Sequence, residues 1–173
     1  MTVREEWVTI ELASILRAEG WRIVSVHPPG GQGPFVIPRE ALDRNIERNS
    51  FHPDLVAVRQ RDGESRVLVA ETKPTRTALV GDIAKLAVLA ASRAAMLHVL
   101  FRCQKFPGGP SDGVDFDRYQ SEFSGTFPIE FRVACAGETR STTVKHDLSP
   151  YGLVEESFEM SALIRKYSKP ADE

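Results

Sequence analysis

Two apolar runs separated by a short turn constrain this chain more than any other feature of its sequence. Residues 54–60 and 66–72 are rich in Val, Leu and Ala, and Asp62-Gly63 lies between them. Asp-Gly between apolar runs is a strong signal for a β-hairpin. The sequence therefore predicts an antiparallel hairpin in which Arg61 faces Glu64, and this turn fixes the pairing of every residue behind it.

Both faces of the predicted hairpin are apolar. One face carries Val56, Val58, Val67 and Val69, and the other carries Leu55, Ala57, Leu68 and Ala70. A strand that is apolar on both faces is typical of the covered centre of a sheet. We therefore expect this hairpin to lie inside an α/β or α+β protein, with helices on both sides of the sheet.

Periodicity predicts the remaining elements around the hairpin. The spacing of apolar residues predicts helices over 4–19, 38–48, 77–94 and 155–167. Alternating or continuous apolar runs predict further strands over 21–26, 96–103, 127–135 and 140–146. The first six elements outside 38–48 follow in the order helix, strand, strand, strand, helix, strand.

Length, charge and cysteine content limit the class of protein. The 173 residues fit one domain, and no apolar run approaches the roughly 18 residues of a membrane span. Cys103 and Cys135 are interpreted as buried thiols in a reducing compartment, so we expect a cytoplasmic protein. The net charge is -2, with a basic excess over 1–110 and an acidic excess over 111–173, so the first part can face phosphate more easily.

The hairpin register predicts a site at the open end of the two strands. It places Asp54 directly opposite Glu71, with Lys73 two residues further on the same face and His52 opposite Lys73. Two carboxylates this close repel each other, and a divalent cation would remove that repulsion. Oxygen ligands favour Mg²⁺, or alternatively Mn²⁺, and the Lys73 ammonium can stabilise developing charge or position a water molecule.

The motif formed by these residues resembles a known signature. Pro53-Asp54, followed by Glu71-Thr72-Lys73, is similar to the P-D…(D/E)-x-K motif of the PD-(D/E)XK nuclease superfamily. The resemblance covers about residues 4–103. It implies a restriction-endonuclease-like αβββαβ core with a central mixed sheet flanked by helices, followed by C-terminal strands and a helix over about 104–173. It also implies that Asp54 and Glu71 bind the metal, that the Thr72 carbonyl joins them, and that Lys73 is catalytic.

The resemblance implies a Mg²⁺-dependent nuclease that cleaves phosphodiester bonds, with DNA favoured over RNA. An alternative is a catalytically silent nuclease-like module that binds nucleic acid or protein as a subunit of a larger complex. A third is a hydrolase of small phosphate compounds. A homodimer or a partner subunit would be compatible with the first two.

The first helix offers one further candidate metal ligand. Glu11 falls inside its apolar stripe, and in similar nucleases a first-helix glutamate often joins the metal. Alternatively, Glu11 lies at the rim of the stripe and reaches water. Glu5 and Glu6 are interpreted as ordinary acids of the first helical turn.

Several other residues are candidates for contacts to the substrate. Arg76 and Thr77 begin the helix after Lys73, where free backbone N–H groups favour a phosphate. Lys85 either reaches the substrate or forms an intrahelical pair with Asp82, and we favour the pair. His52 either contacts the substrate or is a structural histidine. Arg39 either contacts the substrate or belongs to a solvated helix face.

Overall fold

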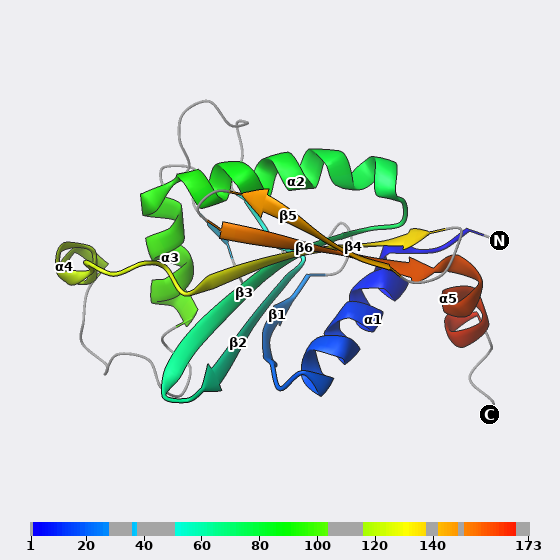
Figure 1. The fold of residues 1–173 in the computed structure, drawn as a ribbon, viewed down its shortest axis with the longest axis horizontal. Helices are drawn as coiled ribbons and strands as arrows, with labels where there is room; N and C mark the ends of the chain where they lie inside the picture. Colours follow the sequence, from blue (N-terminus) through cyan, green and yellow to red (C-terminus); the bar gives the residue numbers. More distant parts are fainter. Residues whose placement is uncertain are drawn as a thin grey trace.

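A computed structural model describes residues 2–27, 36–37, 51–103, 116–137, 142–148 and 151–168. These residues form one mixed sheet of six strands with helices on both faces (Figure 1). The strand order is β1-β2-β3-β4-β6-β5, and the strands are β1 (Arg22–Val26), β2 (Leu55–Arg61), β3 (Glu64–Lys73), β4 (Ile129–Gly137), β5 (Thr142–Leu148) and β6 (Tyr151–Glu159). The helices are α1 (Glu5–Ala18), α2 (Arg76–Ala91), α3 (Arg93–Cys103), α4 (Phe116–Glu122) and α5 (Met160–Tyr167).

The β2–β3 hairpin forms in the predicted register. Arg61 pairs with Glu64, and the ladder continues to Leu55 opposite Ala70. Asp62 and Gly63 have φ values of 55° and 81°. Positive φ at both central residues is the geometry of a type I′ turn, whose twist matches that of the strands it joins. The turn chemistry therefore explains why this local prediction is confirmed.

Strand β3 lies at the centre of the sheet, antiparallel to β2 and parallel to β4. Strand β4 is in turn parallel to β6, so the carboxyl ends of β3, β4 and β6 meet at one edge. The chain leaves β3 at that edge and enters α2. Loops and helix N-termini therefore gather at the end of β3 that carries Glu71 and Lys73.

Two apolar cores cover the two faces of the sheet, as the sequence predicts. Val56 and Val69 pack with α2 and α3 on one face. Leu55 and Leu68 pack with α1 and α5 on the other. Figure 1 shows α1 and α2 on opposite sides of the sheet. Cys103 and Cys135 are buried free thiols, as expected from the sequence.

The predicted strand over 96–103 is wrong, because these residues belong to α3. The run is apolar on almost every side, with Met96, Leu97, Val99 and Leu100 all buried. Such a run suits a buried helix as well as a buried strand. The place beside β3 is taken by β4, so the last strand of the αβββαβ order comes from the region beyond residue 103.

The C-terminal part also differs from the prediction. The predicted helix over 155–167 begins only at Met160, because residues 151–159 form β6 between β4 and β5. The helix predicted over 38–48 lies outside the described residues. In the described part of the chain no helix is, on its own, long and apolar enough to cross a bilayer, and only α2 and α3 together, bent by 90°, meet that criterion.

Candidate active site

The structure brings Asp54, Glu71 and Lys73 together at the carboxyl end of β3. The Nζ atom of Lys73 lies 4.0 Å from Oδ2 of Asp54. Asp54 and Glu71 are both buried. The predicted trio therefore forms a compact cluster at the sheet edge where α2 begins.

Asp54 reaches this cluster in a different way from the prediction. The paired ladder stops at Leu55–Ala70, one residue short of the predicted Asp54–Glu71 pair. Instead, Oδ2 of Asp54 accepts a hydrogen bond of 2.7 Å from the backbone N–H of Thr72 and one of 3.2 Å from its hydroxyl. These hydrogen bonds fix the carboxylate through Oδ2, and Oδ1 accepts none from the described residues.

Glu71 is a buried carboxylate with little compensation. It is 4% exposed, and its Oε1 atom receives no hydrogen bond from any described residue. Burial, followed by the charges of Asp54 and Asp82, raises the pKa of Glu71 well above its ordinary value. Burial also raises the pKa of Asp54, although the Thr72 N–H opposes that shift. In the absence of a ligand, this cluster therefore favours a proton on Glu71.

Two further carboxylates belong to the cluster. Glu5, in the first turn of α1, accepts a hydrogen bond of 2.8 Å from Nζ of Lys73. Asp82, 3% exposed on α2, lies 3.6 Å from the same Nζ atom. Neither residue was predicted at the site. Asp82 could have been recognised only as a charged residue among the apolar positions of the helix, and the contact of Glu5 depends on how α1 docks.

The surrounding acids determine the charge state of Lys73. Burial by itself would lower the pKa of Lys73, but its hydrogen bond to Glu5 and the charges of Asp54 and Asp82 together raise it well above the ordinary value. Lys73 is therefore a permanent ammonium in this environment. It can stabilise negative charge, but it does not act as a base near neutral pH.

Helix α1 is fixed against the site through a threonine pair. The hydroxyl of Thr9 lies 2.6 Å from the hydroxyl of Thr72, and both side chains are buried. This contact holds the first turn of α1, and hence Glu5, beside Lys73. The hydroxyl of Thr72 thus contacts both Asp54 and Thr9, and its carbonyl remains a predicted ligand.

Glu11 is not brought to this cluster, contrary to expectation. Its carboxylate accepts hydrogen bonds of 2.6 Å from both Lys166 and Tyr167 of α5. Burial would raise the pKa of Glu11, but these two hydrogen bonds and the Lys166 charge lower it overall. Helix spacing placed Glu11 correctly on a half-buried face, but that face meets α5.

The structure also places the predicted substrate contacts. Lys85 lies 3.3 Å from Asp82, which confirms the favoured intrahelical pair. Arg76 donates a hydrogen bond of 2.7 Å to Glu155 of β6, and Thr77 is exposed in the first turn of α2. The ring of His52 stacks on that of His27 with centroids 5.8 Å apart. The predicted pairing of His52 with Lys73 is not formed, because the β2–β3 ladder ends at Leu55–Ala70. Arg39 lies outside the described residues.

The cluster fits a divalent cation in its chemistry. Four carboxylates, those of Glu5, Asp54, Glu71 and Asp82, surround the single ammonium of Lys73, with Lys85 at the rim. Oε1 of Glu71 and Oδ2 of Asp82 are buried without a hydrogen bond from the described residues. Within those residues, no three His, Cys, Asp or Glu side chains are already arranged to hold a metal. These two carboxylate oxygens nevertheless supply the ligand type that Mg²⁺ prefers.

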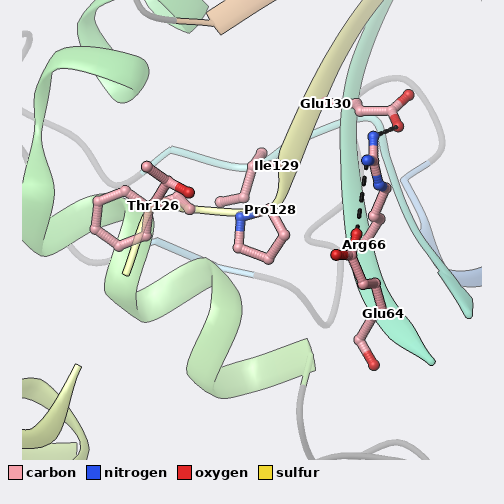
Figure 2. Close-up of a pocket in the computed structure, with 8 residues that line it drawn as sticks. Glu64, Arg66, Thr126, Pro128, Ile129 and Glu130 are labelled. Carbon is pink, nitrogen blue, oxygen red and sulfur yellow. Dashed lines mark hydrogen bonds and ion pairs between the residues drawn. The ribbon is translucent and has the colours of Figure 1, made fainter. Parts of the chain in front are cut away.

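A separate pocket lies at the other end of the hairpin (Figure 2). It has a volume of about 470 Å³ and is lined by residues 64–66 and 126–130. Arg66 in its wall is 3.3 Å from Glu130 and 3.8 Å from Glu64, so these charges neutralise one another. At about 3.3 Å per residue along β3, this pocket lies about 25 Å from Lys73. It is therefore distinct from the carboxylate cluster.

Comparisons with protein-family models, with curated proteins and with solved structures gave no match. The candidate site is thus defined by its own residues and their geometry.

Proposed function

We propose that this protein is a metal-dependent nuclease that hydrolyses phosphodiester bonds at the Asp54–Glu71–Lys73 cluster. The observation that carries this proposal is the buried carboxylate oxygen of Glu71, which accepts no hydrogen bond from the described residues and lies near the carboxylates of Asp54 and Asp82 and the ammonium of Lys73. A buried charge without a partner destabilises a protein, so its presence is best explained by a ligand. Mg²⁺ is the proposed cofactor, with Mn²⁺ as a substitute.

In this proposal Asp54 and Glu71 hold the cation, while the Thr72 N–H keeps Asp54 oriented. When bound, the cation polarises a phosphate oxygen and lowers the pKa of a water molecule. Glu71 has to release its proton to bind the cation, so metal binding strengthens as the pH rises. Its raised pKa thereby couples metal occupancy to pH.

Lys73 supplies positive charge where the phosphate becomes more negative in the transition state. Glu5 holds Nζ of Lys73 in place at 2.8 Å. Because Lys73 is an ammonium throughout the neutral range, we assign it electrostatic stabilisation. The proton of the attacking water would then pass to a carboxylate or to solvent, because Lys73 already carries its proton.

The architecture supports a restriction-endonuclease-like assignment. The described elements include α1, β1, β2, β3, α2 and β4 in chain order, with β1 to β4 adjacent in the sheet. This is the αβββαβ order that the sequence motif implies, although β4 begins at Ile129 instead of within 96–103. Nucleic acid is the proposed substrate class, and DNA is the first substrate to test.

The test is cleavage of circular, linear and single-stranded DNA and of RNA in Mg²⁺, Mn²⁺ or EDTA. Glu71→Gln and Lys73→Met retain side-chain size and should each lower the cleavage rate at least about 100-fold, since each removes charge from the reacting centre. Glu64→Gln is a matched control, because Glu64 is exposed at the other end of the same strand.

Metal-dependent cleavage by the native protein and by Glu64→Gln, but not by the two site variants, would support the proposal. No cleavage of any polymer, together with no heat of Mg²⁺ or Mn²⁺ binding in calorimetry, would contradict it. A silent nuclease-like binding module would then become the leading hypothesis.

A further inference from the structure

A second buried carboxylate lies on the same sheet face as Glu71, two strands away. Glu71 of β3 is paired with Val133 of β4, and Val133 is paired with Glu155 of β6. Paired residues project to the same face, and neighbouring strands are about 4.8 Å apart. The backbones of Glu71 and Glu155 are therefore about 10 Å apart in one row across the sheet.

Glu155 has a specific cationic partner. It is only 3% exposed, and it accepts a hydrogen bond of 2.7 Å from Nε of Arg76. A buried carboxylate is tolerated when it is paired and hydrogen-bonded. The interaction also fixes Arg76, the first residue of α2, at the carboxyl edge of the sheet.

Only part of the Arg76 guanidinium is used in this pair. The side chain is 71% exposed, and its bond to Glu155 is made through Nε. The two terminal amino groups have no partner among the described residues. Arginine presents its donors in a rigid fork that matches the oxygens of a phosphate, so a guanidinium held at one edge offers the other edge to a ligand.

We propose that Glu155 is a positioning residue that holds Arg76 as a clamp for a backbone phosphate beside the one cleaved at Asp54 and Glu71. The inference rests on the proposed nuclease function and adds a second phosphate contact to it. The row from Glu71 through Val133 to Glu155 places the clamp along the edge where α2 begins. A substrate with several phosphates, such as a nucleic-acid strand, can reach both positions.

Binding of a fluorescently labelled DNA oligonucleotide, measured by anisotropy over a range of salt concentrations in Mg²⁺, tests the clamp. All proteins carry Glu71→Gln to suppress cleavage. Arg76→Ala should weaken binding about tenfold, the effect of losing one charge-assisted contact. It should also reduce the slope of log affinity against log salt by about 0.7–0.9, the value for one phosphate.

The matched control is Arg61→Ala, which removes the same charge from an exposed side chain at the hairpin turn, far from the site. It should leave affinity and salt slope close to those of the parent protein. Glu155→Gln should weaken binding less than Arg76→Ala. Because Glu155 acts through Arg76, the double variant should bind no more weakly than Arg76→Ala alone. The double variant also avoids an unpaired buried carboxylate, so it serves as a folding control.

In a protein with Glu71 restored, Arg76→Ala should raise KM by about the same tenfold, with a smaller change in kcat. Equal salt slopes for Arg76→Ala and Arg61→Ala would overturn the clamp, even if the native protein cleaves DNA. Additive effects of Arg76→Ala and Glu155→Gln would overturn the positioning role of Glu155. A parent protein that binds no oligonucleotide would overturn the clamp. The nuclease function is tested separately, by metal-dependent cleavage with the native protein.

Discussion

At the scale of single residues, the candidate site combines groups with opposite effects on stability. Glu71 is buried beside Asp54 and Asp82, and its pKa is raised. Lys73 neutralises part of that charge through contacts of 2.8 to 4.0 Å with three carboxylates. Removing the Glu71 carboxylate and removing the Lys73 ammonium should therefore change the stability of the metal-free protein in opposite directions, although both should abolish cleavage.

Glu71→Gln should stabilise the metal-free protein at pH 8 by about 1–3 kcal/mol, because the folded protein no longer has to bury a carboxylate or take up a proton at that pH. The folded protein binds the Glu71 proton more tightly than the unfolded chain. Glu71 therefore makes stability fall as the pH rises from the unfolded pKa through the raised folded pKa. Urea unfolding in EDTA at pH 5 and pH 8 measures both effects.

Glu64→Gln, at an exposed position of the same strand, controls for the change of net charge. If the stability of Glu71→Gln depended on pH as strongly as that of the native protein, the raised pKa of Glu71 and its cause would be wrong.

Lys73→Met should destabilise the metal-free protein by about 2 kcal/mol, because Glu5, Asp54 and Asp82 lose their shared cation. This value lies below the 3–5 kcal/mol typical of a fully buried pair, since the Lys73 side chain is 25% exposed. Thermal and urea unfolding at pH 7 measure the change. Unaltered stability would mean that the contacts of Lys73 carry no net energy in solution.

At the scale of elements, α1 connects the site to the C-terminal helix. Its first turn supplies Glu5 to Lys73, Thr9 contacts Thr72, and Glu11 is bound to α5. Helix α1 thus carries one carboxylate at the site, Glu5, and a second carboxylate, Glu11, that holds α1 against α5. The two glutamates give a matched pair for separating metal binding from stability.

Glu5→Gln should weaken Mg²⁺ binding several-fold, because it removes negative charge and releases Lys73, whereas Glu11→Gln should leave binding unchanged. Isothermal titration with Mg²⁺ at pH 8 measures both affinities. Weaker binding in Glu11→Gln alone would restore the original expectation that this residue is a metal ligand.

Glu11→Gln should instead lower stability by about 0.5–1 kcal/mol, a modest value because Lys166 is half-exposed. The lowered pKa of Glu11 means that its contribution is present above the unfolded pKa and is lost as the pH falls through the folded value. The difference in stability between this variant and the native protein should therefore be larger at pH 7 than at pH 3, as measured by urea unfolding. A difference independent of pH would contradict the assigned ion pair.

At the scale of the whole molecule, the sheet edge joins segments that are far apart in the chain. Glu5, Asp54, Glu71 and Asp82 come from α1, the start of the hairpin, β3 and α2, and Glu155 comes from β6. A cation bound among them links these elements in the folded state only. Binding should therefore stabilise the protein against global unfolding.

Mg²⁺ at ten times its Kd should raise the free energy of unfolding by about 1.4 kcal/mol, or Tm by about 3–6 °C for a chain of this size. The increase should be larger at pH 8 than at pH 5, because Glu71 has to be deprotonated to bind. Thermal unfolding with Mg²⁺ and with EDTA at both pH values measures this. A similar increase in Glu71→Ala would show that the cation binds elsewhere.

Local chemistry made part of this structure predictable from sequence. The Asp62-Gly63 turn determined the hairpin register, and the alternation of apolar residues determined that both faces are covered. That register brings Asp54, Glu71 and Lys73 to the same end of the hairpin, although the ladder stops at Leu55–Ala70 and Asp54 joins the cluster through its hydrogen bonds from Thr72.

Other features depend on long-range packing and could not be predicted from local patterns. The apolar run of α3 satisfies either a strand or a helix, and it is a helix because β4 occupies the place beside β3. The choice of Glu5 over Glu11 depends on where α1 docks, through Thr9 and Thr72. The Arg76–Glu155 pair joins residues 79 positions apart, one at the start of α2 and one in β6. The sequence by itself thus determined the hairpin and the approach of two acids and a lysine at its open end, whereas only the tertiary structure decided which other charges surround them, because those contacts depend on how distant elements pack.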